Sequence, residues 1–205
     1  MTEKKFVAQI IRLYKKAKRP YFPDKHITRA EGRPIPSIIE DLLAKYLAEA
    51  TRHKYEIIIN KLLICNDIVF PNKIKTDLTF VQNGKIIAFV DVKTELGYKR
   101  KEFVQHSRVK DRLVLRLRGK QIFSSQLSIS KNIRYHIVLI SSKNIPIPLM
   151  APIEKKFKRL KASTLYILTR TKHPNQRKLD VQQTMSAVSI EEREFRMLVT
   201  NIAHN

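Results

Sequence analysis

Residues 74–95 read IKTDLTFVQNGKIIAFVDVKTE, a stretch that predicts two β-strands joined by a turn at Asn83-Gly84. An Asn-Gly pair between two apolar segments is the strongest short-range signal for a β-hairpin. The second arm ends in an acid-x-Lys sequence, Asp91 to Lys93, and strand residues two positions apart point to one face of the sheet. Asp91 and Lys93 are therefore expected to emerge side by side, while the valines that flank Asp91 face the opposite layer.

The first arm carries Asp77, and the register of the hairpin decides which face this residue takes. A two-residue loop would pair Asp77 with Val90 and turn it away from Asp91. We predict instead a three-residue loop over 82–84, with its glycine in the left-handed position of a G1 bulge. That register places Asp77 opposite Phe89 and diagonal to Asp91, with roughly 7 to 8 Å between the two α-carbons.

The composition predicts a folded domain with a polyanionic partner. The chain has 205 residues, 43% of them hydrophobic, and carries 41 Lys+Arg against 18 Asp+Glu, which gives a formal net charge of +23. A disordered basic arm would hold fewer apolar residues, and a compact body with this charge favours a partner rich in phosphate, with nucleic acid as the leading candidate. Binding to a membrane surface ranks lower because the basic residues are spread over several elements.

The sequence also excludes some classes of protein. A single cysteine allows no internal disulfide, the N-terminal stretch lacks the uninterrupted apolar run of a secretory signal, and no segment approaches the roughly 20 apolar residues that span a bilayer. We therefore expect a cytoplasmic protein with no membrane association.

Apolar periodicity predicts strands and helices in a mixed order, which favours an α/β domain. Ser37 is expected to cap the clearest helix, with Glu40 completing a capping box. The other expected helices are Lys4–Lys18, Lys99–Lys120, Ile153–Lys161 and Ile190–Ile202, and the expected strands are Tyr55–Cys65, Ile74–Val81, Ile86–Lys93, Tyr135–Ser141 and Leu165–Leu168.

The order acid, hairpin, acid-x-Lys resembles the active site of the PD-(D/E)XK nuclease superfamily, which includes most type II restriction endonucleases. The matching stretch covers roughly 20 residues. The resemblance implies a restriction endonuclease-like α/β/α core, in which helices flank a mixed central sheet of about five strands. It implies Asp77, Asp91 and Lys93 as catalytic residues, together with an acid on an early helix. Helical phase favours Glu40 over Asp41 for that acid.

The resemblance further implies one nuclease domain over residues 1–205. Its N-terminal helical part would reach about residue 53, the catalytic core would span about 54–170, and a helical segment would occupy about 171–205. Asp77, Asp91, Glu40 and the carbonyl of Val92 would bind Mg²⁺, for which Mn²⁺ may substitute, because these are hard oxygen ligands. Lys93 would orient the attacking water and stabilise the transition state.

The function implied by the resemblance is Mg²⁺-dependent, sequence-specific cleavage of double-stranded DNA that leaves 5′-phosphates. A homodimer would cut both strands, and in a restriction system a cognate DNA methyltransferase would act on the same site. Phosphate contacts are expected from the basic stretch that follows the acid-x-Lys strand. Its candidate residues are Tyr98, Lys99, Arg100, Lys101, Arg108, Lys110 and Arg112, and a second basic stretch runs from Lys155 to Lys178.

Two alternatives stay open at the level of the sequence. A structure-specific DNA nuclease, such as a junction resolvase or a phage or transposon DNA-processing enzyme, would carry the same residues. A non-catalytic nucleic-acid-binding protein, for instance a ribosome-associated one, would need only the charge. In that case Asp91 and Lys93 would form an ion pair at a strand end, and Glu40 would serve the helix cap.

Overall fold

The computed structural model describes residues 1–17, 34–65, 72–96, 100–123, 125–176 and 178–204. The helices in these ranges are α1 (Glu3–Ala17), α2 (Pro36–Ala50), α3 (Arg100–Leu117), α4 (Ile147–Phe157), α5 (Val181–Ala187) and α6 (Glu192–Ala203). The strands are β1 (Glu56–Ile59), β2 (Leu62–Ile64), β3 (Lys73–Lys75), β4 (Leu78–Gln82), β5 (Lys85–Lys93), β6 (Ser128–Ser141), β7 (Ser163–Thr171) and β8 (Val188–Ile190).

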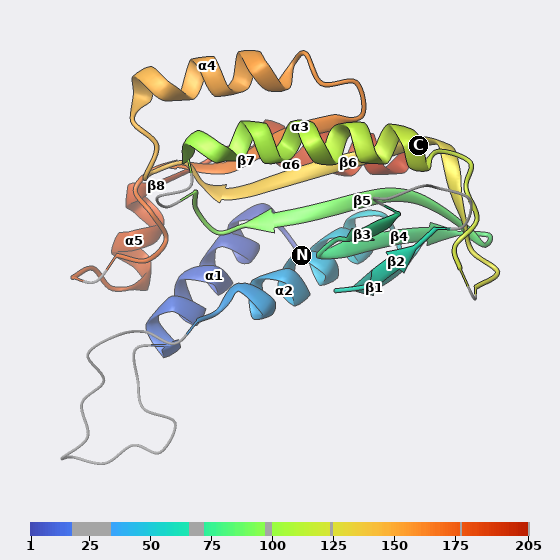
Figure 1. Ribbon diagram of the computed structural model, residues 1–205. Coiled ribbons are helices and arrows are strands. Elements are labelled where there is room, and N and C mark those ends of the chain that lie inside the picture. Colours follow the sequence, from blue (N-terminus) through green and yellow to red (C-terminus); the bar gives the residue numbers. More distant parts are fainter. Residues whose placement is uncertain (18–33, 66–71, 97–99, 124, 177, 205) are drawn as a thin grey trace.

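Six of these strands form one mixed sheet in the order β1-β4-β5-β6-β7-β8, with helices on both faces (Figure 1). The predicted α/β class with a mixed central sheet is confirmed, with six strands in the described residues rather than about five. β5, β6 and β7 are parallel, and their carboxyl ends therefore meet at one edge of the sheet. β4 and β1 extend the sheet antiparallel beyond β5, and β8 does so beyond β7.

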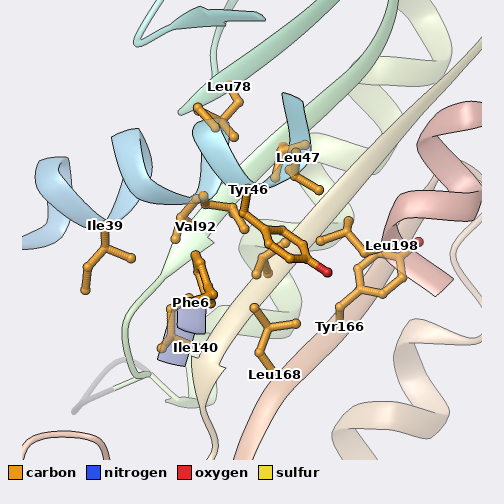
Figure 2. Packing of buried hydrophobic residues seen from close by; sticks show 14 of the residues in the cluster. Phe6, Ile39, Tyr46, Leu47, Leu78, Val92, Ile140, Tyr166, Leu168 and Leu198 are labelled. Atoms are coloured by element: carbon orange, nitrogen blue, oxygen red, sulfur yellow. The ribbon is translucent and has the colours of Figure 1, made fainter. Parts of the chain in front are cut away.

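Each face of the sheet carries its own hydrophobic core. α1, α2 and α6 cover one face, where Phe6, Tyr46 and Leu198 pack against side chains of the sheet such as Val92 and Tyr166 (Figure 2). α3 and α4 cover the other face and bury a second set of apolar residues, with Phe103, Phe89, Val114, Ile137 and Phe157 among them. The two helices that connect the parallel strands thus lie on the same side, as right-handed crossovers between neighbouring strands require.

Two of the predicted strands are each divided between two sheets. The expected strand Tyr55–Cys65 breaks at Asn60, whose φ is 55°, so that β1 joins the large sheet and β2 pairs with β3. Asparagine tolerates this left-handed conformation better than most residues do. The expected strand Ile74–Val81 is also divided, because β3 pairs with β2 and β4 joins the large sheet. Asp77 lies in a bend just before β4.

The hairpin turn is shorter than predicted. It consists of Asn83 and Gly84, both with positive φ (50° and 72°), and Gln82 pairs directly with Lys85. The expected three-residue loop is therefore wrong. Positive φ at both central positions is typical of a type I′ turn, whose twist suits the flanking strands.

The expected bulge is present, but it lies in β5 at Ile87. Ile86 belongs to the core beneath α3, Ile87 and Ala88 both belong to the core beneath α1 and α2, and Phe89 returns to the first. A bulge inserts one extra residue and so reverses the alternation of the strand beyond it. Because of this reversal, Asp91 faces the side of the sheet that α3 covers.

The bulge also sets the position of Asp77 relative to β5. Leu78 pairs with Val90, which brings Asp77, the preceding residue, level with Asp91. The predicted position of Asp77 opposite Phe89 is therefore wrong by two residues. The predicted consequence, two carboxylates on one face of the hairpin, nevertheless holds.

Buried His136 predicts how the stability of the fold depends on pH. Burial lowers the pKa of His136 to about 3, and the charge of Arg134 lowers it further. The Nδ1 of His136 lies 3.1 Å from the Tyr166 hydroxyl. Below a pH of about 6.5, His136 binds a proton in the unfolded chain but not in the folded protein. The free energy of unfolding therefore falls by about 1.4 kcal/mol for each unit by which the pH is lowered. We expect the free energy of unfolding, measured by urea titration between pH 7.5 and 5, to change less steeply with pH in His136→Gln than in wild type. The exposed His53→Gln is the control, and equal slopes for wild type and His136→Gln would contradict this assignment.

Candidate active site

Asp91 lies at the centre of a charged cluster near the carboxyl end of β5. It is 4% exposed, and its Oδ2 accepts hydrogen bonds from the Tyr135 hydroxyl at 2.6 Å and from the Lys110 ammonium. The Nζ of Lys93 lies 3.7 Å from the same oxygen. The other oxygen, Oδ1, is buried and has no hydrogen-bond partner among the described residues. A buried carboxylate oxygen without a partner lowers the stability of the fold and indicates a place for a hydrogen-bond donor or a cation.

Tyr135 and Lys110 hold Asp91 from two different elements. Tyr135 comes from β6, the parallel neighbour of β5, and burial together with the Asp91 charge raises the pKa of its hydroxyl well above the ordinary value. The hydroxyl therefore keeps its proton and donates it to Asp91. Lys110 comes from α3, and its Nζ also reaches the Lys75 carbonyl at 3.4 Å.

Asp77 approaches Asp91 from the neighbouring arm of the hairpin. Its Oδ2 accepts the Val92 N–H at 2.6 Å and lies 3.7 Å from the Nζ of Lys93. Burial raises the pKa of Asp77, and the Asp91 carboxylate raises it further, whereas the Val92 N–H, Lys93 and Lys110 oppose the shift. Lys93 thus stands between two carboxylates, and the structure brings the predicted residues Asp77, Asp91 and Lys93 together.

Glu40 reaches this cluster from α2. The helix begins at Pro36 with Ile35 as its N-cap residue and has no side-chain cap, so the predicted capping box at Ser37 is wrong. Glu40 Oε2 accepts a hydrogen bond from Asn60 Nδ2 at 2.8 Å, and the backbone N–H of Asn60 donates to the Asp77 carbonyl at 2.8 Å. Glu40 is therefore tied to the loop that carries Asp77 rather than to its own helix end.

The charges of the cluster act on Glu40. Burial raises its pKa, the Asn60 hydrogen bond lowers it, Asp77 raises it and Lys93 lowers it. The neighbouring acid Asp41 is exposed, as helical phase predicts. The structure thus places Glu40, and not Asp41, beside the other predicted site residues.

The remaining predicted residues have different outcomes. The carbonyl of Val92 accepts the Lys93 ammonium at 3.3 Å, so in this arrangement it serves Lys93. Arg108 and Arg112 are exposed on α3, whereas Lys110 turns inward to Asp91. Tyr98 and Lys99 lie outside the described residues, as do the side chains of Arg100 and Lys101.

The roles of three participants do not follow from the sequence patterns. These patterns predict Tyr135 as the first residue of a buried strand, Lys110 as a phosphate contact and Asn60 as an interior strand residue. A polar residue at the start of the strand that follows the basic helix is the signal that could have marked Tyr135. The Asn60-Lys61 pair inside an apolar run could have marked the break at Asn60.

A pocket of about 350 Å³ opens beside the cluster. Its lining includes Asp91, Lys93, Glu95, Phe103, Lys110 and Tyr135. Apolar walls with a few convergent charged groups are typical of a substrate site.

The residues present fit a hard divalent cation. Among the described residues, no group of three or more His, Cys, Asp or Glu side chains is placed to hold a metal ion. Mg²⁺ needs less than that, because it keeps several waters and is usually held by one or two carboxylates together with substrate phosphate. Asp77 and Asp91 supply two carboxylates, and the partnerless Oδ1 of Asp91 is the atom that such a cation would contact.

Comparisons of the chain with protein-family models, with curated proteins and with solved structures each found no match. Within the part of the chain that the structure describes, no helix combines the length and the apolar character needed to cross a membrane. The site itself must therefore carry the assignment of function.

Repulsion between the two carboxylates predicts a variant of increased stability. Because burial and Asp91 raise the pKa of Asp77, its charge is unfavourable in the metal-free protein at pH 7. Asp77→Asn keeps the acceptor for the Val92 N–H and should raise the free energy of unfolding by about 1 kcal/mol. Added Mg²⁺ should raise the melting temperature of wild type but not of Asp77→Asn, since a ligand stabilises only the state that binds it.

The control for this prediction is Asp41→Asn on the exposed side of α2, which should melt like wild type with and without Mg²⁺. Calorimetry or thermal-shift assays give both measurements. An Asp77→Asn protein that is less stable than wild type, or that still gains stability from Mg²⁺, would contradict the role assigned to Asp77.

Proposed function

We propose that the protein is a Mg²⁺-dependent endonuclease that hydrolyses phosphodiester bonds in DNA. The observation that carries the proposal is the meeting of Asp77, Asp91 and Lys93 on one face of a bulged hairpin, with the buried Oδ1 of Asp91 lacking a partner. An isolated ion pair at a strand end would need neither the second carboxylate nor the bare oxygen. Perturbed acids beside a cation in a pocket are typical of a catalytic site.

Each residue has a physical role in this proposal. Asp77 and Asp91 would hold the metal ion, which when bound lowers the pKa of a water and offsets charge on the phosphate. Tyr135 and Lys110 fix the orientation of Asp91 through its Oδ2 and leave the buried Oδ1 without a partner. Lys93 places an ammonium between the two carboxylates, where it can stabilise negative charge that develops on the phosphate. Glu40 adds a carboxylate from the α2 side.

The distribution of positive charge supports a nucleic-acid substrate. α3 exposes Arg108, Arg112 and Arg116, which lie four residues apart and so follow one side of the helix, and α4 ends in a cluster of exposed lysines. Both helices cover the sheet face toward which Asp91 and Lys93 point. The exposed arginines lie across α3 from the inward-turned Lys110, so they add positive charge to the outer surface of this layer and do not line the acidic site.

Sequence-specific cleavage of double-stranded DNA that leaves 5′-phosphates is the task implied by the resemblance to restriction endonucleases. One site cuts one strand, so a homodimer would deliver both cuts. The alternative activity is cleavage of branched DNA with the same residues.

The test is cleavage of plasmid and phage DNA by the purified protein in Mg²⁺, in Ca²⁺ and in EDTA, beside Asp91→Asn and the control Asp41→Asn. We expect discrete fragments from wild type and Asp41→Asn in Mg²⁺, and at least a 100-fold loss of rate in Asp91→Asn, because an essential charge-stabilising group is removed. DNA binding measured in Ca²⁺ should survive in all three proteins.

Each other result has a defined meaning. Cleavage confined to branched DNA would replace sequence-specific cleavage by the structure-specific activity. DNA that is bound equally by wild type and Asp91→Asn but never cut would overturn the nuclease proposal and leave a nucleic-acid-binding protein.

A further inference from the structure

A second group of polar side chains gathers where the parallel strands end. Glu95 lies two residues beyond β5, Asn144 lies three residues beyond β6, and His173 lies two residues beyond β7. Glu95 lines the same pocket as Asp91 and Lys93. The carboxyl edge of parallel strands is where open α/β sheets bind their ligands, so this group stands at the entrance to the proposed site.

Asn144 holds the Glu95 carboxylate in place, because Glu95 Oε2 accepts a hydrogen bond from the Asn144 side-chain amide. His173 Nε2 lies 3.6 Å from the same oxygen, beyond hydrogen-bond distance, and has no hydrogen-bond partner among the described residues. The Glu95 side chain is nevertheless 41% exposed, so the carboxylate is oriented by protein groups and still reaches water. This combination suits a group that exchanges protons with solvent.

The protonation of His173 follows from its hydrogen bonds. Nδ1 accepts the Asn175 N–H at 2.9 Å, so the proton of the neutral ring is on Nε2, the nitrogen that faces Glu95. His173 is buried, and the edge of its ring packs against Tyr14 with 5.4 Å between centroids. The imidazole therefore turns an N–H toward the Glu95 carboxylate without forming a hydrogen bond to it in this arrangement.

The proposed reaction needs an acceptor for the proton of the attacking water, and the triad does not provide one. Lys93 lies between two carboxylates as an ammonium and has no lone pair to offer. Asp91 is engaged by Lys110 and Tyr135, Asp77 by the Val92 N–H, and both would hold the metal ion. The described lining of the pocket offers two further groups that can accept a proton, Glu95 and His106 of α3, and Asn144 donates the hydrogen bond that orients Glu95.

We infer that Glu95 is the general base of the proposed nuclease, and that His173 and Asn144 are positioning residues that orient its carboxylate. This inference rests on the proposed function. In the step it serves, the oxygen of a water forms a bond to phosphorus while the bond from phosphorus to the 3′-oxygen breaks. One proton of that water passes to Glu95 and then to solvent, and the departing 3′-oxygen takes up a proton from solvent.

The experiment measures single-turnover cleavage in saturating Mg²⁺, DNA affinity in Ca²⁺ and Mn²⁺ affinity for a matched set of variants. Glu95→Gln keeps the acceptor for Asn144 but cannot take up the proton, and should lose about 100-fold or more in the cleavage rate constant. Its Kd values for DNA and for Mn²⁺ should stay within about twofold of wild type, as general-base action affects the chemical step and not binding. Glu192→Gln, an exposed acid at the start of α6, is the control with unchanged rate.

Two substitutions of His173 test its positioning role. His173→Phe keeps a ring against Tyr14 but removes the N–H that faces Glu95, and should lower the rate constant about 10-fold through misplacement of the carboxylate. His173→Gln restores an N–H donor and should recover most of this loss. Equal rates for His173→Phe and His173→Gln, with equal melting temperatures, would overturn the role of His173.

The outcomes separate this inference from the proposed function. Full cleavage by Glu95→Gln beside an inactive Asp91→Asn would overturn the role of Glu95 and leave the nuclease standing. Loss of Mn²⁺ affinity in Glu95→Gln would make Glu95 a metal ligand and would also overturn the inference. Failure of wild type itself to cleave DNA in Mg²⁺ would remove the proposed function, and the role of Glu95 with it.

Discussion

The β-bulge at Ile87 is the constraint on which the rest of the site depends. The apolar residues before and after it fill two different cores, one beneath α1 and α2 and one beneath α3. A regular strand from Ile86 would send Asp91 and Lys93 into the first core, where two charges would meet only apolar side chains. The extra residue turns them toward α3 instead, and the same shift brings Asp77 level with Asp91. One inserted residue thus positions three functional side chains.

The cluster that results joins two carboxylates, Asp77 and Asp91, with two ammonium groups, Lys93 and Lys110. The two acids lie close together and largely buried, so Asp91 raises the cost of ionising Asp77, and Lys93 and Lys110 offset this cost in part. One buried oxygen of Asp91 stays without a partner. A divalent cation, as we propose, would give this oxygen a partner. The buried acids lower the free energy of unfolding of the metal-free protein, and this cost is consistent with a catalytic site.

The sequence predicts the turn and the acid-x-Lys strand because both signals are local. Asn83-Gly84 specifies a tight turn, and the separation of two residues places Asp91 and Lys93 on one face. The bulge cannot be located in the same way, since the run from Ile86 to Val90 is apolar throughout and the two cores, not the alternation, decide where the extra residue goes. Lys110 and Tyr135 escape prediction because they lie 19 and 44 residues from Asp91 in the chain and meet it through the crossover helix and the parallel strand. Glu40 is found by helical phase, but its link to Asp77 runs through Asn60, in a strand break that no local pattern specifies.

We propose that the bulged hairpin builds a cation site from Asp77 and Asp91. A crystal of the protein soaked in Mn²⁺ and measured by anomalous diffraction would locate the ion. We expect an anomalous peak within ligand distance of both carboxylates and in contact with Oδ1 of Asp91. A peak bound by other residues, or no peak at saturating Mn²⁺ with both carboxylates accessible to solvent, would contradict it.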